Sequence, residues 1–219
     1  MTSAITSRPA TLVFVSGTGT DVGKTWWTAA VTRELRAAGV SVAARKPAQS
    51  GTPGVGPSDA EQLAAATGEE LDAVRPAHRD YALAWAPPMA ARELGAPGFT
   101  VGDLVAETTW PPGIDVGFVE GAGGPRSPMA DDGDNVDLAR ALAPDLVVVV
   151  TDLRLGAINA VRLSVAPFDG LPVVVACNRY VPDRLSVETA AVLRADGTDL
   201  VTSPSELASF LTSRMTSWH

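Results

Sequence analysis

The feature that most constrains this 219-residue chain is an apolar run that passes through a small polar loop into Gly23-Lys24-Thr25. Residues Thr11 to Ser16 read as a strand, Gly17 to Val22 form the loop, and Lys24 to Ala38 read as a helix that stops at Gly39. In this order, backbone N–H groups and a helix N-terminus converge on one point, which is a geometry that binds phosphate. The sequence therefore predicts a phosphate-binding loop at the end of a strand.

The loop has the chemistry of a Walker A motif, in which a Lys reaches the β- and γ-phosphates and a Ser or Thr hydroxyl ligates Mg²⁺. Lys24 and Thr25 stand in these positions, although five residues, one more than usual, separate Gly17 from Gly23. An acidic residue at the end of a neighbouring strand normally completes the metal shell. We assign this role to Glu120, which closes the apolar run 114–119. The sequence thus favours ATP and Mg²⁺ as cofactors.

Lys46 ends the second apolar run, and the carboxyl ends of parallel strands form the ligand rim of an open sheet. We therefore expect its ammonium group to face the phosphates. Taken alone, a Lys at a strand end is more often an ordinary solvated surface charge, and the sequence leaves that alternative open.

Short β-branched runs alternate with helix-like segments along the chain, and this alternation predicts a parallel sheet with helices on both faces. We expect one α/β domain over residues 1–219: a three-layer, doubly wound, mostly parallel sheet of about seven strands with P-loop NTPase architecture. The expected further strands are 40–45, 114–119, 146–151 and 173–177, and the expected further helices are 59–66, 136–142, 190–194 and 205–214. The Pro-rich segment 87–112 gives no readable element.

Composition excludes several classes of protein. A formal net charge of −8 disfavours binding to nucleic acid and to anionic lipid. The single cysteine, Cys177, rules out an intrachain disulfide, fits a reducing cytoplasm, and reads as packing within an apolar strand. The stretch 1–10 lacks the long apolar run of a signal peptide or anchor, and the run 146–150 is too short to cross a bilayer. We expect a cytoplasmic protein.

Several short motifs in colinear order go beyond a generic P-loop. They are Gly17-Thr18-Gly19-Thr20-Asp21-Val22-Gly23-Lys24-Thr25, Lys46-Pro47-Ala48-Gln49-Ser50-Gly51, Ser58-Asp59, Glu120-Gly121-Ala122-Gly123-Gly124, Pro128, Leu155-Gly156-Ala157-Ile158-Asn159 and Asn178. Together they resemble the dethiobiotin synthetase family. The resemblance implies a homodimeric enzyme of biotin synthesis that closes a ureido ring, using 7,8-diaminopelargonate, CO₂ or bicarbonate, and MgATP.

The same resemblance implies roles for individual residues. Lys24, Lys46 and Thr20 would be catalytic, and Thr25, Asp59 and Glu120 would hold Mg²⁺. The implied nucleotide-binding set is Asp21, Val22, Gly23, Lys24, Thr25, Trp26, Glu120, Asn178 and Pro204, in which Asn178 reads the adenine edge. The implied substrate-binding set is Thr20, Lys46, Ser50, Gly123, Leu155, Gly156 and Asn159, the last three across a dimer interface.

Three residues in and after the loop depart from the family pattern. Asp21 stands where the family often has Glu, and Trp26 and Trp27 fill a helical turn where small residues are commoner. The rings either belong to the core or narrow the pocket, and we favour the core for both, since aromatic area is usually buried. The cluster Asp131, Asp132 and Asp134 beside a Gly reads as a solvated turn.

Other functions remain open on the sequence. A partitioning ATPase of the ParA/MinD class is one, although the second signature Lys of that class is missing from the loop 18–20. An amidotransferase similar to the cobyrinate diamide enzymes would need a further glutaminase domain, for which 219 residues leave no room. A nucleotide-binding homologue that has lost the diamine substrate is the third.

Overall fold

The computed structural model describes residues 8–216, and the termini at 1–7 and 217–219, including most of the stretch considered for a signal peptide, lie outside that range. Within it, six parallel strands form a central sheet in the order β10-β9-β8-β1-β5-β2. The predicted α/β class and P-loop architecture are confirmed, with six strands in this sheet where about seven were expected. The strands are β1 (Thr11–Gly17), β2 (Val42–Arg45), β5 (Val116–Glu120), β8 (Leu146–Asp152), β9 (Val173–Asn178) and β10 (Asp199–Val201).

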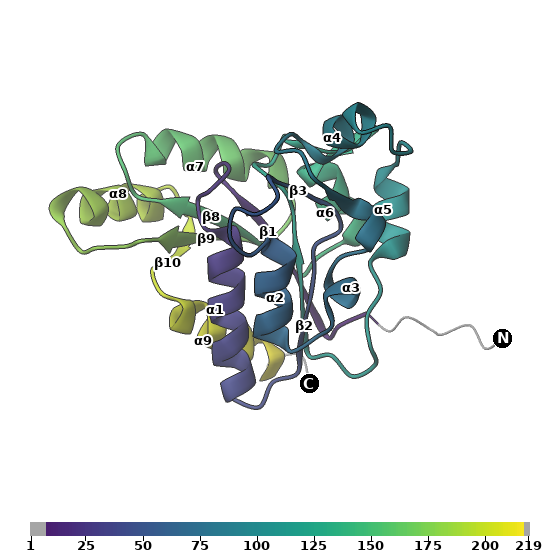
Figure 1. The fold of residues 1–219 in the computed structure, drawn as a ribbon. Helices are drawn as coiled ribbons and strands as arrows, with labels where there is room; N and C mark the ends of the chain where they lie inside the picture. The colour runs from purple at the N-terminus through teal and green to yellow at the C-terminus, as the bar shows by residue number, and fades with distance from the viewer. Residues whose placement is uncertain (1–7, 217–219) are drawn as a thin grey trace.

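Helices cover both faces of this sheet, giving three layers (Figure 1). One face carries α1 (Lys24–Ala37), α2 (Asp59–Thr67), α3 (Leu71–Val74) and α9 (Pro204–Thr216). The other carries α4 (Pro87–Glu93), α5 (Val101–Glu107), α6 (Asn135–Leu142), α7 (Ala157–Val165) and α8 (Arg184–Ala195). Short elements complete the chain: 3₁₀ turns at Ala77–Arg79 and Ala166–Phe168, and the small pairs β3 (Gln49–Ser50) with β4 (Asp80–Tyr81) and β6 (Pro128–Ala130) with β7 (Gly133–Asp134).

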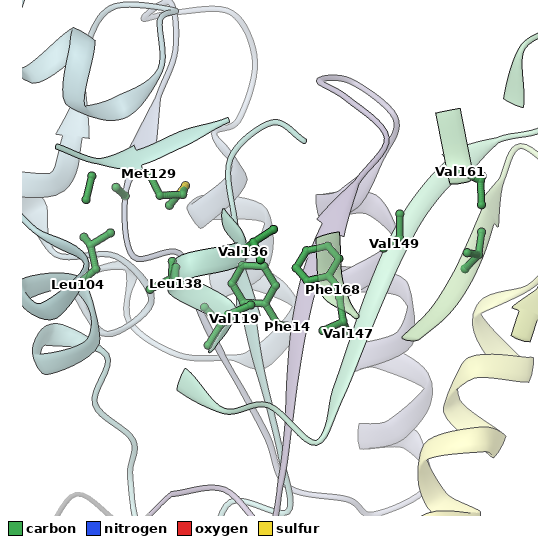
Figure 2. Close-up of a cluster of buried hydrophobic side chains, with 14 of the residues drawn as sticks. Phe14, Leu104, Val119, Met129, Val136, Leu138, Val147, Val149, Val161 and Phe168 are labelled. Atoms are coloured by element: carbon green, nitrogen blue, oxygen red, sulfur yellow. The ribbon is translucent and has the colours of Figure 1, made fainter. Parts of the chain in front are cut away.

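The strand pleat divides the core into two clusters. Successive side chains of a strand point to opposite faces, so Leu12 and Phe14 pack on one side of β1 while Val13 and Val15 pack on the other. Figure 2 shows the first cluster, where Phe14 meets Phe168 with ring centroids 6.4 Å apart. Because both faces are buried, the central strands are apolar throughout, which is the pattern that the sequence displayed.

The first turn of α1 separates the two Trp rings. Trp27 is 2% exposed and lies on the same helical face as Val31 and Leu35, at the i, i+4, i+8 spacing of a buried stripe. Trp26 is 51% exposed, because the neighbouring helical position points about 100° away from that stripe. The core interpretation is therefore confirmed for Trp27 and wrong for Trp26.

Three segments place the candidate site at the carboxyl edge of the sheet. The loop after β1 lies between β5 and β8, and the Thr18 amide donates to the Val150 carbonyl at 2.9 Å. Glu120 ends β5, and Lys46 follows β2, the strand that pairs with β5. Parallel pairing therefore brings the loop, the acid and the second lysine to one rim.

Candidate functional site

The P-loop runs from the end of β1 into α1, and its turn depends on Gly23. Gly23 has φ +95° and is the N-cap of α1, and a Cβ there would lie 2.1 Å from the Asn178 Nδ2. A side chain is thus excluded both by backbone conformation and by space. The Lys24 ammonium lies inside the loop and donates to the Gly19 carbonyl at 3.0 Å. Burial, with the nearby charge of Lys46 as the next cause, lowers the pKa of Lys24.

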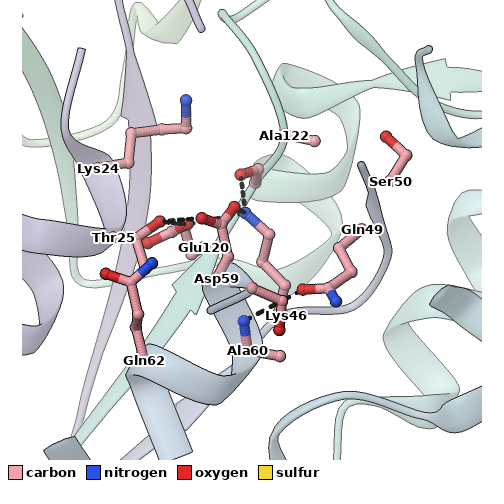
Figure 3. A network of polar contacts seen from close by, with 12 residues as sticks. Lys24, Thr25, Lys46, Gln49, Ser50, Asp59, Ala60, Gln62, Glu120 and Ala122 are labelled. Carbon is pink, nitrogen blue, oxygen red and sulfur yellow. Dashed lines mark hydrogen bonds and ion pairs between the residues drawn. The ribbon is translucent and has the colours of Figure 1, made fainter. Parts of the chain in front are cut away.

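Lys46 is buried in an ionic cluster. Its Nζ lies 2.7 Å from Glu120 Oε1 and 2.7 Å from Asp59 Oδ2, and it donates to the Gly121 carbonyl at 3.1 Å (Figure 3). Lys46 is 1% exposed and Glu120 is 0% exposed, so the alternative of a solvated surface lysine is wrong. Burial alone would lower the pKa of Lys46, but the charges and hydrogen bonds of the two carboxylates outweigh it and raise that pKa above the usual value.

Thr25, Asp59 and Glu120 bring three oxygens together. The Thr25 hydroxyl lies 2.7 Å from Asp59 Oδ1 and 2.8 Å from Glu120 Oε1. One hydroxyl proton can serve only one of these oxygens at a time. The charge of Lys46 lowers the pKa of Asp59 to about 2, although burial acts against this, so the carboxyl is ionised at neutral pH. A hydroxyl and two carboxylates are hard oxygen donors of the kind that hold Mg²⁺ together with waters and phosphate.

A second polar layer positions these groups. Asp59 opens α2 after Ser58, which caps the helix through a capping box with Glu61. Gln49 accepts from the Ala60 amide at 3.1 Å and so ties the loop after Lys46 to the same helix. The Thr28 hydroxyl, one turn after Lys24, lies 3.0 Å from the Lys24 carbonyl and 3.2 Å from Glu120 Oε2, and its single proton can serve either oxygen. Thr28 carries no motif of its own, and Gln49 stands within the motif 46–51 but had no role assigned to it from the sequence.

A hollow of about 1290 Å³ opens beside the cluster. Its lining includes the expected residues Thr20, Asp21, Gly23, Lys24, Thr25, Trp26, Lys46, Ser50, Asp59 and Gly123. It also includes Gly51, the last residue of the motif 46–51, and the loop 52–57 and Trp85, which sequence reasoning did not identify. Trp85 lies at the edge of the Pro-rich segment, and its carbonyl accepts from the Ser50 hydroxyl.

The other expected residues are not part of this lining. Asn178 ends β9 and donates through Nδ2 to the Val22 carbonyl at 2.9 Å, so it contacts the P-loop main chain. Pro204 opens α9. Leu155, Gly156 and Asn159 lie at the start of α7, where all three are exposed and Leu155 is 92% exposed. Cys177 is buried among apolar side chains, in agreement with a packing role.

Comparison with known proteins gives a consistent family. An AAA domain model matches residues 11–188. The ATP-dependent dethiobiotin synthetase of Corynebacterium efficiens is 41% identical over 156 residues, which is 70% of this chain and 68% of that protein. The enzyme of the same name from Caulobacter vibrioides is 38% identical over 192 residues, covering 84% and 86%.

Solved structures with a similar fold are more distant in sequence. A Borrelia burgdorferi protein described as a plasmid partition protein, bound to AMPPNP, has a TM-score of 0.54 at 11% identity, covering 95% of this chain and 90% of that one. The signal recognition particle receptor FtsY of Elizabethkingia anophelis has a TM-score of 0.51 at 15% identity, covering 95% and 66%. These likenesses show the fold alone, so the partition protein does not favour the partitioning-ATPase alternative. None of the helices within residues 8–216 is long and apolar enough to cross a membrane.

Proposed function

Because the chain belongs to the family of ATP-dependent dethiobiotin synthetases, an ATP-dependent ligase family, we propose that it joins 7,8-diaminopelargonate and CO₂ at the cost of ATP. The products are dethiobiotin, ADP and phosphate. The observation that carries the proposal is the cluster of Lys46, Glu120, Asp59 and Thr25 beside the P-loop lysine. A P-loop that only bound nucleotide would have no need for a second, fully buried lysine at this rim.

Mg²⁺ fits the donor set, and Thr25, Asp59 and Glu120 would hold it. When bound, the ion would offset the negative charge of the ATP phosphates. Lys24 would contact the β- and γ-phosphates from the P-loop side, and Lys46 would approach them from the side of Asp59 and Glu120. Both ammonium groups are positioned by main-chain carbonyls before substrate arrives, since Lys24 donates to Gly19 and Lys46 to Gly121. Such preorganised charge stabilises a transferring phosphoryl group.

The chemistry needs no side-chain nucleophile. One amine of the diamine adds to CO₂ and loses a proton, which gives a carbamate. A carbamate oxygen then attacks the γ-phosphate, and ADP leaves. The second amine attacks the resulting carbonyl carbon, phosphate leaves, and a second proton is released as the ureido ring closes. In this sequence Lys24 and Lys46 stabilise the charge that builds on the γ-phosphate, and Thr20 lies in the wall of the same hollow.

We propose that the chain acts as a single synthetase domain over residues 1–219 and as a homodimer. The substrate-binding residues Ser50 and Gly123 line the hollow of one chain, whereas Leu155, Gly156 and Asn159 lie on an exposed surface of their own. A second copy that presents this surface to the hollow would supply the contact for the carboxylate tail of the diamine. Asn178 would hold the P-loop through Val22 and contact the adenine ring with its other face.

The test mixes purified protein with MgATP, diaminopelargonate and ¹³C-labelled bicarbonate and follows the products by mass spectrometry. The proposal predicts a ureido product that carries one labelled carbon. If the protein hydrolyses ATP at the same rate with and without the diamine and forms no labelled product, then the alternative of a homologue that has lost its substrate is correct.

A further inference from the structure

The side chain of Asn135 is buried behind the candidate site. Asn135 is the first residue of α6 and is 0% exposed. Its Nδ2 donates to the carbonyls of Ala122 and Gly124, each at 2.7 Å, with a longer contact to the Ser127 carbonyl at 3.3 Å. One carboxamide thus ties together the loop that follows Glu120.

The oxygen of the same carboxamide sets the position of Gly121. Asn135 Oδ1 is buried and accepts no hydrogen bond within the described part of the chain. It lies 1.9 Å from the place where a Cβ of Gly121 would be, so it packs directly against the glycine backbone. A buried oxygen without a donor costs stability. Gly121 in turn accepts from Lys46 Nζ at 3.1 Å, so Asn135 acts one residue away from the ionic cluster.

The capped N-terminus of α6 holds the backbone of Asn135 in place. Asp134 caps α6, accepting from the Val136 and Asp137 amides at 2.8 and 3.1 Å, and Asp137 completes a capping box. The helix start therefore fixes the Asn135 backbone. Asp134 belongs to the acidic cluster 131–134, which the sequence suggested to be a solvated turn. In the structure this residue caps α6 and so precedes Asn135 directly.

The loop held by Asn135 faces the hollow. Ala122 and Gly123 belong to its lining. The Ala122 amide donates to Met129 Sδ at 3.3 Å, and the Gly124 amide donates to Ser127 Oγ at 2.9 Å. Gly123, with φ +71°, is thus the middle of a loop whose two neighbours are both fixed.

From this geometry we infer that Asn135 is a positioning residue for the diamine: it sets the loop 121–124 that meets the substrate and the Gly121 carbonyl that orients Lys46. The inference rests on the proposed function, since it concerns the substrate side of that same site. Asn135 is fully buried and is not part of the lining of the hollow, so it would act through the main chain of the loop. A displacement of about 1 Å in such a loop is enough to slow the reaction ~100-fold.

The test compares Asn135→Asp and Asn135→Ala with the parent protein, varying the diamine and ATP separately. Asn135→Asp keeps the shape but sets a carboxylate against two carbonyl oxygens, and Asn135→Ala removes the donors. We expect kcat/KM for the diamine to fall ~10- to 100-fold per folded molecule, with KM for ATP unchanged. Leu35→Ala, in a buried position near the far end of α1, is the control that lowers stability without changing either KM.

The possible results distinguish a failure of the Asn135 inference from a failure of the proposed function. Parent-like kinetics in both variants, or a rise in KM for ATP equal to the rise in KM for the diamine, would overturn the inference while the proposed function stands. A parent protein that makes no ureido product would end the proposed function, and the inference with it.

If the Asn135 variants do not fold, Gly121→Ala probes the contact from the other side. Its methyl group would collide with Oδ1, and its effect on kcat/KM should shrink in the Gly121→Ala/Asn135→Ala double variant. Equal effects of Gly121→Ala in both backgrounds would overturn the coupling.

Discussion

Replacing Lys46 by Met removes one charge from the ionic cluster at nearly constant volume. Glu120 is then left fully buried, and removing one partner of a buried ion pair costs about 3–5 kcal/mol. The Thr25 and Thr28 hydroxyls still lie 2.8 and 3.2 Å from the two Glu120 oxygens, and Asp59 is in part open to water. We therefore expect a loss near the lower limit, about 3 kcal/mol, which corresponds to a fall in Tm of roughly 6–12 °C for a domain of this size.

The same substitution should affect turnover more than binding. If Lys46 stabilises charge on the transferring phosphoryl group, its loss raises the barrier by about 2–4 kcal/mol, or ~30- to 1000-fold in kcat. The substitution leaves the P-loop, with Lys24 at its centre, unaltered, so the affinity for ATP should change much less.

The assay combines a thermal melt with diamine-dependent ADP release. Arg162→Met is the matched control, because it breaks an exposed ion pair with Asp196 at 2.8 Å and such pairs contribute little. Its Tm and turnover should equal those of the parent. A Lys46→Met variant that melts at the parent temperature and keeps the parent kcat would show that the buried charge adds neither stability nor catalysis.

Three further perturbations test other parts of the structure. Gly23→Ala should weaken ATP binding measured by calorimetry, because its Cβ would lie 2.1 Å from the Asn178 Nδ2. Gly197→Ala, which is also at positive φ but has open space around it, should only lower Tm. Equal ATP affinity in both variants would contradict this expectation. The pKa of Asp59 is about 2 against an ordinary 3.8, so its ionised form adds stability above pH 3.8 that is lost as the pH falls toward 2. The difference in Tm between the parent and Asp59→Asn should therefore close over that range. A difference that does not change with pH would contradict the lowered pKa. Burial raises the pKa of Cys177 to about 12, so a thiol reagent at pH 8 should label the native protein slowly and the unfolded protein fast, and rapid native labelling would show that the thiol is accessible.

The fold could be predicted where burial controls the sequence pattern. The five apolar runs became β1, β2, β5, β8 and β9, because strands buried on both faces must be apolar throughout. The strand β10 was missed, since it has only three residues and Asp199 at its start is exposed.

Helices were missed where proline obscured the pattern. Pro87 and Pro88 open α4, and proline is favoured in the first turn of a helix, where its missing N–H costs nothing. The start of α8 at Arg184 was missed because its buried face begins with the polar residues Ser186 and Thr189, whereas Leu185 and Val187 are exposed.

The candidate site could likewise be predicted only in part from the sequence. Lys46, Asp59 and Glu120 could be found because they stand at the ends of elements, and parallel topology collects strand ends at one rim. Asn135 could not be found, because its role depends on a contact between the first residue of α6 and Gly124, eleven residues earlier in the chain. Trp26 was misassigned because composition alone does not tell which of two adjacent helical positions faces the core.

The central claim is that the P-loop and the buried Lys46 cluster use ATP to close a ring on a diamine. The most direct measurement is the ratio of ADP to ureido product in one reaction that contains MgATP, bicarbonate and diaminopelargonate. We expect one ADP for each ureido ring, with neither product formed when the diamine is omitted. ADP release that continues without the diamine, or that exceeds ring formation many times over, would contradict it.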